Sequence, residues 1–361
     1  MAVTLKEIAD AAGVSRGTVD RVLHGREGVN EETKKRVLEI INRMDYNPNL
    51  MARALKSANK IIKIGVIVPS ETSNPFYIDV NQGINEAARM AATFGIEVIC
   101  RKPERIEDRQ VVSCIDQLVG CGVKGIAMIG VESPTVRDRI NALPDDIPVI
   151  TFNSDVTDTK RMCFVGNNHL VAGRTAGCLM SAVLRGSGKI ALLISQMEFK
   201  AHTERIEGFK QVFDENHRAE IEFIGPYMTY ESEKAAYDIV RELLQREKDL
   251  IGIYVAGGGQ QPAGRALADS RRAHDVHMIC HDLLPETAEY VRQGIVDFTI
   301  GQEAFEQGYM PIEVFKDYYM LGRKPSMEKL YTRIDIRTKE NITFKGYEVF
   351  TGLYSTRRES F

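Results

Sequence analysis

The first 44 residues carry apolar side chains at helical spacing in three short segments. In residues 5–12, 16–23 and 30–44 the apolar positions recur every three or four residues, which predicts three amphipathic helices. Gly13 follows the first segment and can supply the tight turn of a helix-turn-helix. Ser15 and Asn30 precede the other two segments as helix-capping residues. The side chains expected on the shared apolar face are Leu5, Ile8, Ala9, Ala12, Val19, Val22, Leu23, Val37, Ile40, Ile41 and Met44.

The pattern changes at residue 60. Short, near-continuous apolar runs, typical of parallel strands buried on both faces, alternate from there with amphipathic segments of helical period. The expected strands are residues 61–69, 96–101, 123–130, 147–155, 163–169, 189–195, 219–226, 250–259, 276–282 and 296–302, with late candidates at 329–337 and 347–350. This alternation predicts an α/β fold. Its two series of similar length predict two lobes, each with a doubly wound parallel sheet.

We therefore expect an N-terminal all-α domain, a hinge and a two-lobed core. The expected bounds are 1–48 for the helix-turn-helix domain, 49–60 for the hinge, 61–345 for the core and 346–361 for a C-terminal strand and tail; within the core, 61–161 and 292–323 form the N-lobe, and 162–291 and 324–345 the C-lobe. Ligands of doubly wound sheets bind beyond the carboxyl ends of the strands. The polar loops at those ends predict a ligand site in the cleft between the lobes.

The charge changes sign between the two parts of the chain. Residues 1–60 hold eleven Lys and Arg against eight Asp and Glu, whereas the remainder holds 36 against 42. A basic module on a mildly acidic body fits a nucleic-acid-binding regulator. The chain has no apolar run near the roughly 20 residues that span a bilayer and no secretory signal at its start, so we expect a cytoplasmic protein without membrane contact. The six scattered cysteines form no CxxC pair and are expected to be reduced.

Three stretches resemble the LacI/GalR family of bacterial transcription factors. They read VTLKEIADAAGVSRGTVDRVLHGREGVNEETKKRV from residue 3, DYNPNLMARALKS from residue 45 and IGVIVPSETSNPFY from residue 64. The resemblance extends over residues 3–345. It implies a core similar to the ribose type of periplasmic sugar-binding protein (periplasmic-binding-protein-like, type I). It further implies a homodimer on a near-palindromic operator, whose DNA affinity changes when a small molecule closes the cleft. We expect a repressor controlled by a small sugar or polyol; the residues leave open an activator, and a ligand that acts as inducer or as corepressor.

The resemblance assigns the DNA contacts of the second helix. Arg16, Gly17 and Arg21 match base-reading positions, and an arginine can contact guanine through two hydrogen bonds. Gly17 has no side chain, so part of that readout is missing or falls to Arg16. Asp20 stands where relatives carry serine and is expected either to accept a hydrogen bond from cytosine or to orient Arg21. Candidate phosphate contacts, several of them equally explained as helix caps, are Thr4, Ser15, Thr18, Asn30 and Thr33.

The resemblance also gives the hinge a DNA contact. Leu55 matches a leucine that relatives insert into the minor groove, where an apolar wedge unstacks a base step and kinks the DNA. Asn49, Met51 and Ala52 lie in the same segment and are expected beside the DNA. The alternative is that Leu55 packs against the core.

In the core, the resemblance assigns a first ligand loop. Ser70, Asn74, Phe76 and Tyr77 match it: an aromatic face stacks on a sugar ring while polar neighbours reach its hydroxyls. The alternative for one of the two aromatic residues is burial at the base of the following helix.

Later loops complete the expected ligand site. Asn153, Arg205, Asp282 and Gln302 follow strands or enter the cleft in relatives. Gly259 falls where many sugar binders carry asparagine, and Gln260 or Gln261 could compensate for the missing side chain. This set suits a neutral sugar or polyol, or a ligand whose anionic group is held by Arg205.

The residues give little support to an enzyme. His274, His277 and His281 lie near Asp282, but no further Cys or Glu completes a closed zinc site. The GSGK sequence at 186–189 lacks the spacing of a phosphate loop, and no nucleophilic triad appears. We expect no catalysis, metal or cofactor. The alternatives are a cytoplasmic small-molecule-binding protein or an enzyme built on the same core.

A homodimer is expected because one recognition helix reads too few base pairs. Residues 81–90 and 120–121 resemble the dimer face of the family's N-lobe. Residues 346–361 carry no sustained heptad repeat, so no tetramer is expected.

Overall fold

Three short helices form the N-terminal domain of the computed structural model, which describes residues 5–23, 26, 28–44, 61–72, 74–103, 107–342, 349–350 and 356–357. The helices are α1 (Leu5–Ala12), α2 (Arg16–Leu23) and α3 (Glu31–Arg43). Gly13 ends α1 with a left-handed φ of 64°, a conformation that glycine adopts without a steric penalty. Ile8, Val19 and Val37 are fully buried where the three apolar faces meet. The predicted helices and their shared apolar face are confirmed.

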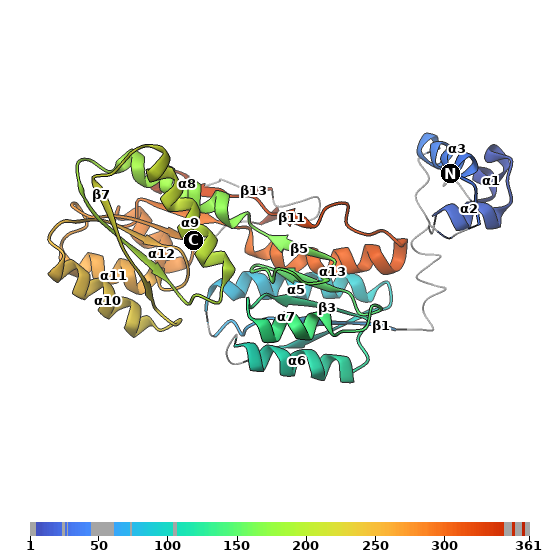
Figure 1. The fold of residues 1–361 in the computed structure, drawn as a ribbon, viewed down its shortest axis with the longest axis horizontal. Coiled ribbons are helices and arrows are strands. Elements are labelled where there is room, and N and C mark those ends of the chain that lie inside the picture. Colours follow the sequence, from blue (N-terminus) through green and yellow to red (C-terminus); the bar gives the residue numbers. More distant parts are fainter. Residues whose placement is uncertain are drawn as a thin grey trace.

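The N-lobe is a six-stranded parallel sheet between two layers of helices. Its strands run in the order β11-β5-β4-β3-β1-β2. Their bounds are β1 (Ile62–Ile67), β2 (Ile96–Arg101), β3 (Gly125–Ile129), β4 (Val149–Phe152), β5 (Cys163–Gly166) and β11 (Lys329–Tyr331). Helices α5 (Phe76–Ala92) and α13 (Ala304–Leu321) cover one face; α6 (Asp108–Gly120) and α7 (Pro134–Asn141) cover the other (Figure 1).

The C-lobe repeats this architecture. Its sheet has the order β12-β10-β9-β8-β6-β7, parallel except where β12 pairs antiparallel with β10. The strands are β6 (Gly188–Ile194), β7 (Ile221–Met228), β8 (Leu250–Val255), β9 (His277–His281), β10 (Phe298–Gly301) and β12 (Asp335–Arg337). The helices are α8 (His169–Val183), α9 (Lys200–Glu215), α10 (Glu233–Arg246), α11 (Gln260–Ser270), α12 (Pro285–Arg292) and the short α14 (Lys339–Ile342). A ladder of β13 (Val349–Phe350) and β14 (Thr356–Arg357) follows.

Three strands lie in the other lobe from the one expected. β5 and β11 were expected in the C-lobe, but β5 pairs with β4, and β11 pairs with β5. β10 was expected in the N-lobe, but it pairs with β9. An apolar pattern marks a strand without indicating which sheet it joins, so the lobe bounds in the sequence were wrong at these points. The chain therefore crosses between lobes after β5, after β10 and between β11 and β12.

Two helix pairs, one in each lobe, approach closely at glycines. A Cβ on Gly83 would lie 2.1 Å from the Phe305 carbonyl oxygen, and one on Gly308 would lie 2.1 Å from that of Val80, so α5 and α13 pack backbone to backbone. In the C-lobe, a Cβ on Gly173 of α8 would likewise lie 2.1 Å from the carbonyl oxygen of Arg205 in α9. These contacts fix the helices that carry the ligand residues described below.

Several predicted residues lie outside the described part of the chain. They are Thr4 and the hinge residues Asn49, Met51, Ala52 and Leu55. Among the helices that the structure describes, none has the length and apolar character needed to cross a membrane.

Candidate functional site

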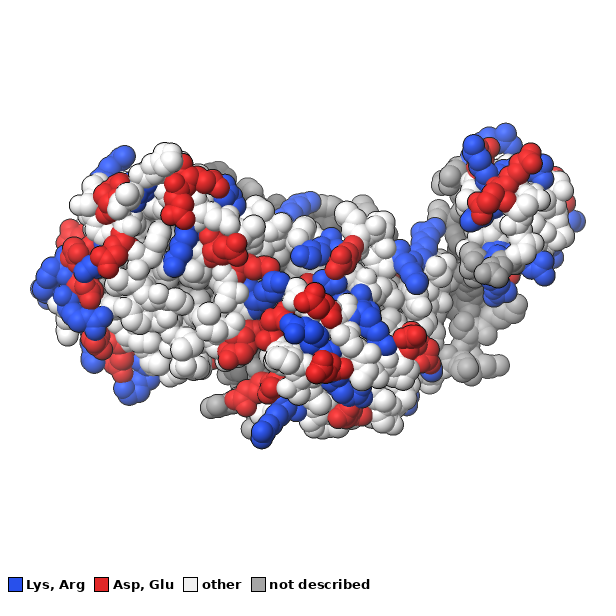
Figure 2. Space-filling view, viewed as in Figure 1, with Lys and Arg blue, Asp and Glu red and all other residues white. Residues whose placement is uncertain are grey.

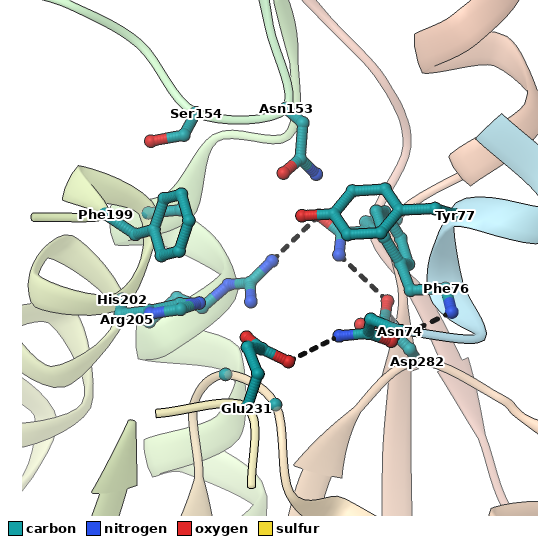
Figure 3. Close-up of a pocket in the computed structure, with 14 residues that line it drawn as sticks. Asn74, Phe76, Tyr77, Asn153, Ser154, Phe199, His202, Arg205, Glu231 and Asp282 are labelled. Carbon is teal, nitrogen blue, oxygen red and sulfur yellow. Dashed lines mark hydrogen bonds between the residues drawn. The ribbon is translucent and has the colours of Figure 1, made fainter. Parts of the chain in front are cut away.

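A pocket lies between the lobes, where the carboxyl ends of both sheets meet (Figure 3). The space between its walls is about 460 Å³, counted out into the open mouth. Its walls are formed by Asn74, Phe76, Tyr77, Asn153, Ser154, Phe199, Ala201, His202, Arg205, Glu231, Gly257, Gly258, Asp282 and Gln302.

Seven of the ten predicted ligand residues line this pocket. They are Asn74, Phe76, Tyr77, Asn153, Arg205, Asp282 and Gln302. The other three, Ser70, Gly259 and Gln260, lie outside it. The Ser70 hydroxyl is 3.0 Å from that of Thr72, within its own turn. Gly259 precedes α11 with a φ of 106°, and Gln260 is buried as the first residue of that helix. The glycine run therefore reaches the pocket one and two residues earlier than expected.

The first ligand loop is built by Asn74. Its Oδ1 accepts a hydrogen bond of 2.9 Å from the amide of Phe76, the first residue of α5. Its Nδ2 donates to Glu231 Oε2 at 2.9 Å, which joins the N-lobe to the C-lobe across the pocket. Phe76 is the aromatic residue that buries, and Tyr77 stands edge-on to it at a centroid distance of 5.4 Å.

Arg205 is the buried cation of the pocket. It is 2% exposed on α9, and its two Nη atoms donate to the Ala256 carbonyl at 2.9 Å and to Gln302 Oε1 at 2.8 Å. Its Nε is buried without a hydrogen-bond partner among the described residues. Burial lowers the pKa of Arg205, and the negative charge of Asp282 opposes that shift. The guanidinium thus holds a fixed orientation and retains donor capacity toward a ligand.

Asp282 provides a carboxylate opposite this cation. Burial raises its pKa to about 6, although Arg205 and a hydrogen bond from Gln302 both lower it. Gln302 Nε2 donates to Asp282 Oδ1 at 2.8 Å. Asp282 also has a left-handed φ of 68°, uncommon for a residue other than glycine. Such backbone strain is often found at ligand sites, where the surrounding structure holds it.

A chain of buried amides crosses from this pair to the N-lobe. Gln307 of α13 is fully buried; its Nε2 donates to the Gln302 carbonyl at 2.7 Å, and its Oε1 accepts from Asn153 Nδ2 at 2.9 Å. Gln307 does not line the pocket, but it orients two residues that do. The sequence showed it only as a polar position on an apolar helix.

Sequence reasoning missed several residues of the pocket wall. Phe199 ends the polar loop after β6, and His202 lies in the first turn of α9; the sequence indicated this stretch only as a region. Their rings lie 5.3 Å apart, and burial lowers the pKa of His202 to about 3, so this ring is neutral at physiological pH. Phe199 belongs to the buried apolar cluster of the N-lobe, although the chain around it is part of the C-lobe. Glu231 lies after β7, in a loop without any recognisable motif.

The histidines weighed as metal ligands point in different directions. His277 Nδ1 is 3.0 Å from Asp297 Oδ1, whereas His281 Nε2 is 2.8 Å from the Tyr254 hydroxyl. Across the described residues, no group of three or more His, Cys, Asp or Glu side chains is arranged to hold a metal ion.

In the N-terminal domain, α2 presents the predicted base-reading positions to solvent. Arg16, Gly17 and Arg21 are exposed. Ser15 begins the helix, and its Oγ accepts from the Thr18 amide at 3.1 Å. Asn30 caps α3 in the same way, through a 2.8 Å bond from the Thr33 amide. The Asp20 carboxylate lies 3.6 Å from the Arg26 guanidinium.

Comparison with known proteins separates the N-terminal domain from the two-lobed core, as the structure does. Residues 4–49 match the family model "Bacterial regulatory proteins, lacI family", and residues 64–324 match "Periplasmic binding protein domain". Catabolite control protein A of Priestia megaterium is 28% identical over 259 residues, which cover 71% of this chain and 74% of that protein. The HTH-type transcriptional regulator MalR of Streptococcus pneumoniae is 28% identical over 228 residues, which cover 60% of this chain and 66% of that protein.

The core resembles solved structures of binding proteins as well. An ABC transporter solute binding protein from Burkholderia graminis C4D1M, solved in complex with D-arabinose, superposes with a TM-score of 0.70 at 23% identity and covers 78% of this chain and 96% of that one. At this identity the likeness concerns the fold. The chain therefore belongs to the periplasmic binding protein domain family over most of its length and carries, at its N-terminus, the DNA-binding domain of the lacI family of bacterial regulatory proteins.

Proposed function

We propose that this protein is a transcriptional repressor that binds a near-palindromic operator as a homodimer and releases it when a small sugar or polyol occupies the pocket. The observation that carries the proposal is the presence, in one chain, of a helix-turn-helix with exposed arginines and a polar pocket walled by both lobes. We expect it to act in the cytoplasm, without catalysis.

The chemistry of the pocket supports a neutral polyol. Carboxylates of Glu231 and Asp282 accept hydrogen bonds from hydroxyls, Arg205 donates to them, and the aromatic face of Tyr77 suits a sugar ring. Two acidic side chains against one arginine disfavour the anionic ligand that the sequence left open. The D-arabinose of the Burkholderia structure is a ligand of this chemical class.

The DNA contacts are assigned to the N-terminal domain. On the face drawn in Figure 2, acidic and basic side chains alternate over both lobes and make no extended basic field. The exposed Arg16 and Arg21 of α2 are suited to guanine and phosphate. Ligand and DNA are coupled if the ligand binds one lobe arrangement better than the other.

The homodimer is proposed on α5. Ile78 and Met90 are 45% and 37% exposed on this helix, which begins with pocket residues Phe76 and Tyr77. The helix thus connects the pocket to the surface that the sequence assigned to the dimer. A shift of the first ligand loop would move that surface directly.

The test begins with operator selection from random DNA, followed by fluorescence anisotropy with a panel of neutral sugars and polyols. We expect steeply salt-dependent operator binding, weakened by at least one member of the panel. The Arg16→Ala variant should lose binding, whereas Arg185→Ala, in the loop before β6, should not. A ligand that binds the pocket without changing operator affinity would contradict the proposed control.

A further inference from the structure

Gly258 lines the pocket without a side chain, and Glu231 fills the space beside it. A Cβ built on Gly258 would lie 2.4 Å from Glu231 Oε2 and 2.8 Å from Oε1, closer than real Cβ atoms approach oxygen. Gly258 is not among the glycines with positive φ, so its backbone would accept any residue. The Glu231 carboxylate thus fills the space that a side chain at position 258 would need.

The Glu231 carboxylate is held there from two sides. Tyr230 and Glu231 both have left-handed φ angles, 51° and 55°, and the Tyr230 amide donates to the Ser195 carbonyl at 2.8 Å. Consecutive non-glycine residues in this conformation persist only where their surroundings impose it. At the other end, Glu231 Oε2 accepts the 2.9 Å bond from Asn74. The loop after β7 is therefore shaped to aim this side chain across the pocket mouth.

We propose that Glu231, seated against Gly258, is a specificity-determining residue that supplies the polar contact missing from the glycine run and selects ligands that donate hydrogen bonds. From the sequence, Gln260 or Gln261 is expected to compensate for the asparagine that is absent at Gly259. Gln260 lies outside the pocket, and Gln261 Nε2 bonds to Glu286 at 2.5 Å. This inference deepens the proposed function of the same pocket and rests on it.

The charge of Glu231 narrows the class of ligand. A carboxylate only accepts hydrogen bonds, and its two oxygens can accept more than the bonds from Asn74 and Ser195. Glu231 and Asp282 both turn into the pocket, while Arg205 is bonded to neutral acceptors (Figure 3). Burial raises the pKa of both carboxylates. When both are ionised, their two negative charges exceed the single positive charge of Arg205. The preferred ligand is a sugar or polyol with an amine in place of one hydroxyl, because an ammonium group forms charge-assisted hydrogen bonds to carboxylates.

The seat of Glu231 is tested without any ligand. The side-chain amide resonance of Asn74, assigned with an Asn74→Asp variant, reports the bond to Glu231 in ¹⁵N-resolved NMR spectra. Gly258→Ala should displace the carboxylate and move this resonance to the position seen in Glu231→Ala. Gly257→Ala is the matched control, because its Cβ would meet His202 at 2.7 Å rather than Glu231. If Gly258→Ala leaves the Asn74 resonance in place, the Glu231 carboxylate does not occupy the space beside Gly258, and the proposal is wrong on this point.

The selectivity is tested by calorimetry with D-glucose, D-glucosamine and D-glucuronate, with the three galactose counterparts, and with D-arabinose. The wild-type protein should bind the amino sugar of a series about tenfold more tightly than its neutral parent, and the uronate weakest. Glu231→Gln keeps the size and the acceptor for Asn74, so it should retain the neutral sugar and lose the preference for the amine. If Glu231→Gln still prefers the amino sugar, this inference is wrong, although the proposed function with a sugar effector is unaffected. A wild-type protein that binds none of these sugars overturns the effector class, and the NMR result still decides the seat.

Discussion

Individual polar residues determine what the pocket can recognise, and their settings differ sharply. Burial keeps the pKa of Asp282 high, at about 6, and that of His202 low, at about 3. The same burial acts in opposite directions because it disfavours the charged form of each group. At neutral pH Asp282 is therefore mostly ionised, although its burial disfavours the charge, and the His202 ring in the same pocket is uncharged.

The raised pKa of Asp282 predicts a pH-dependent stability. Between pH ~4 and ~6 the folded chain keeps a proton on Asp282 that the unfolded chain has released. Binding of this proton stabilises the folded chain, and the contribution is lost as the pH rises through 6. Asp282→Asn should therefore gain melting temperature relative to wild type as the pH is raised from 4 to 8. Asp145→Asn is the control: Lys160 lowers the pKa of this exposed carboxylate, so it titrates below this pH range, and its difference from wild type should stay nearly constant from pH 4 to 8. A difference between Asp282→Asn and wild type that does not vary with pH would contradict the assignment.

Arg205→Lys should weaken effector binding without unfolding the protein. A lysine keeps the charge but cannot hold Ala256 and Gln302 in the fixed fork of the guanidinium. The loss of charge-assisted bonds of about 1.5–3 kcal/mol corresponds to at least a tenfold rise in Kd by calorimetry. Arg174→Lys, in a solvent-exposed pair with Glu215 on the same lobe, is the control and should bind as wild type does. Equal Kd values for both variants would argue against a ligand contact at Arg205.

At the scale of elements, the sequence indicated the strands and helices well and their partners poorly. The apolar runs marked β5, β10 and β11, but the pairing partners that place each strand are distant in sequence. For the same reason Asn74 and Arg205 were found by local motif, whereas Glu231 and Gln307 were not. Both act through contacts with residues far along the chain.

The glycine contacts between helices give a prediction at this scale. Gly308→Ala would bring a Cβ to 2.1 Å from the Val80 carbonyl oxygen and force α13 away from α5. Overpacking of this kind costs roughly 1–3 kcal/mol of unfolding free energy, which chemical denaturation would measure. Gly120→Ala, at the end of α6 with no heavy atom within 4 Å of the built Cβ, should change stability little. Comparable losses of unfolding free energy in the two variants would show that the close approach of α5 and α13 is not the cause.

At the scale of the whole molecule, assembly through α5 would link the pocket to DNA. Ile78→Asp should raise the dimer dissociation constant at least tenfold, because it places a charge in an apolar interface. Sedimentation velocity measures this directly. Val171→Asp on α8 is a close match, with 43% exposure against 45% for Ile78, and should leave the assembly unchanged. If both variants sediment as wild type does, the dimer face lies elsewhere.

Phe199 gives the two-lobed arrangement a kinetic consequence. It is 7% exposed and belongs to the N-lobe apolar cluster, although the loop that carries it leaves the C-lobe strand β6. Separation of the lobes must withdraw this ring into water, at a cost of about 1.5–3 kcal/mol. If the effector leaves only after the lobes separate, this cost adds to the barrier for its release. The Phe199 ring would then lengthen the residence time of the effector, and with it the time for which transcription stays altered after the effector is gone from solution.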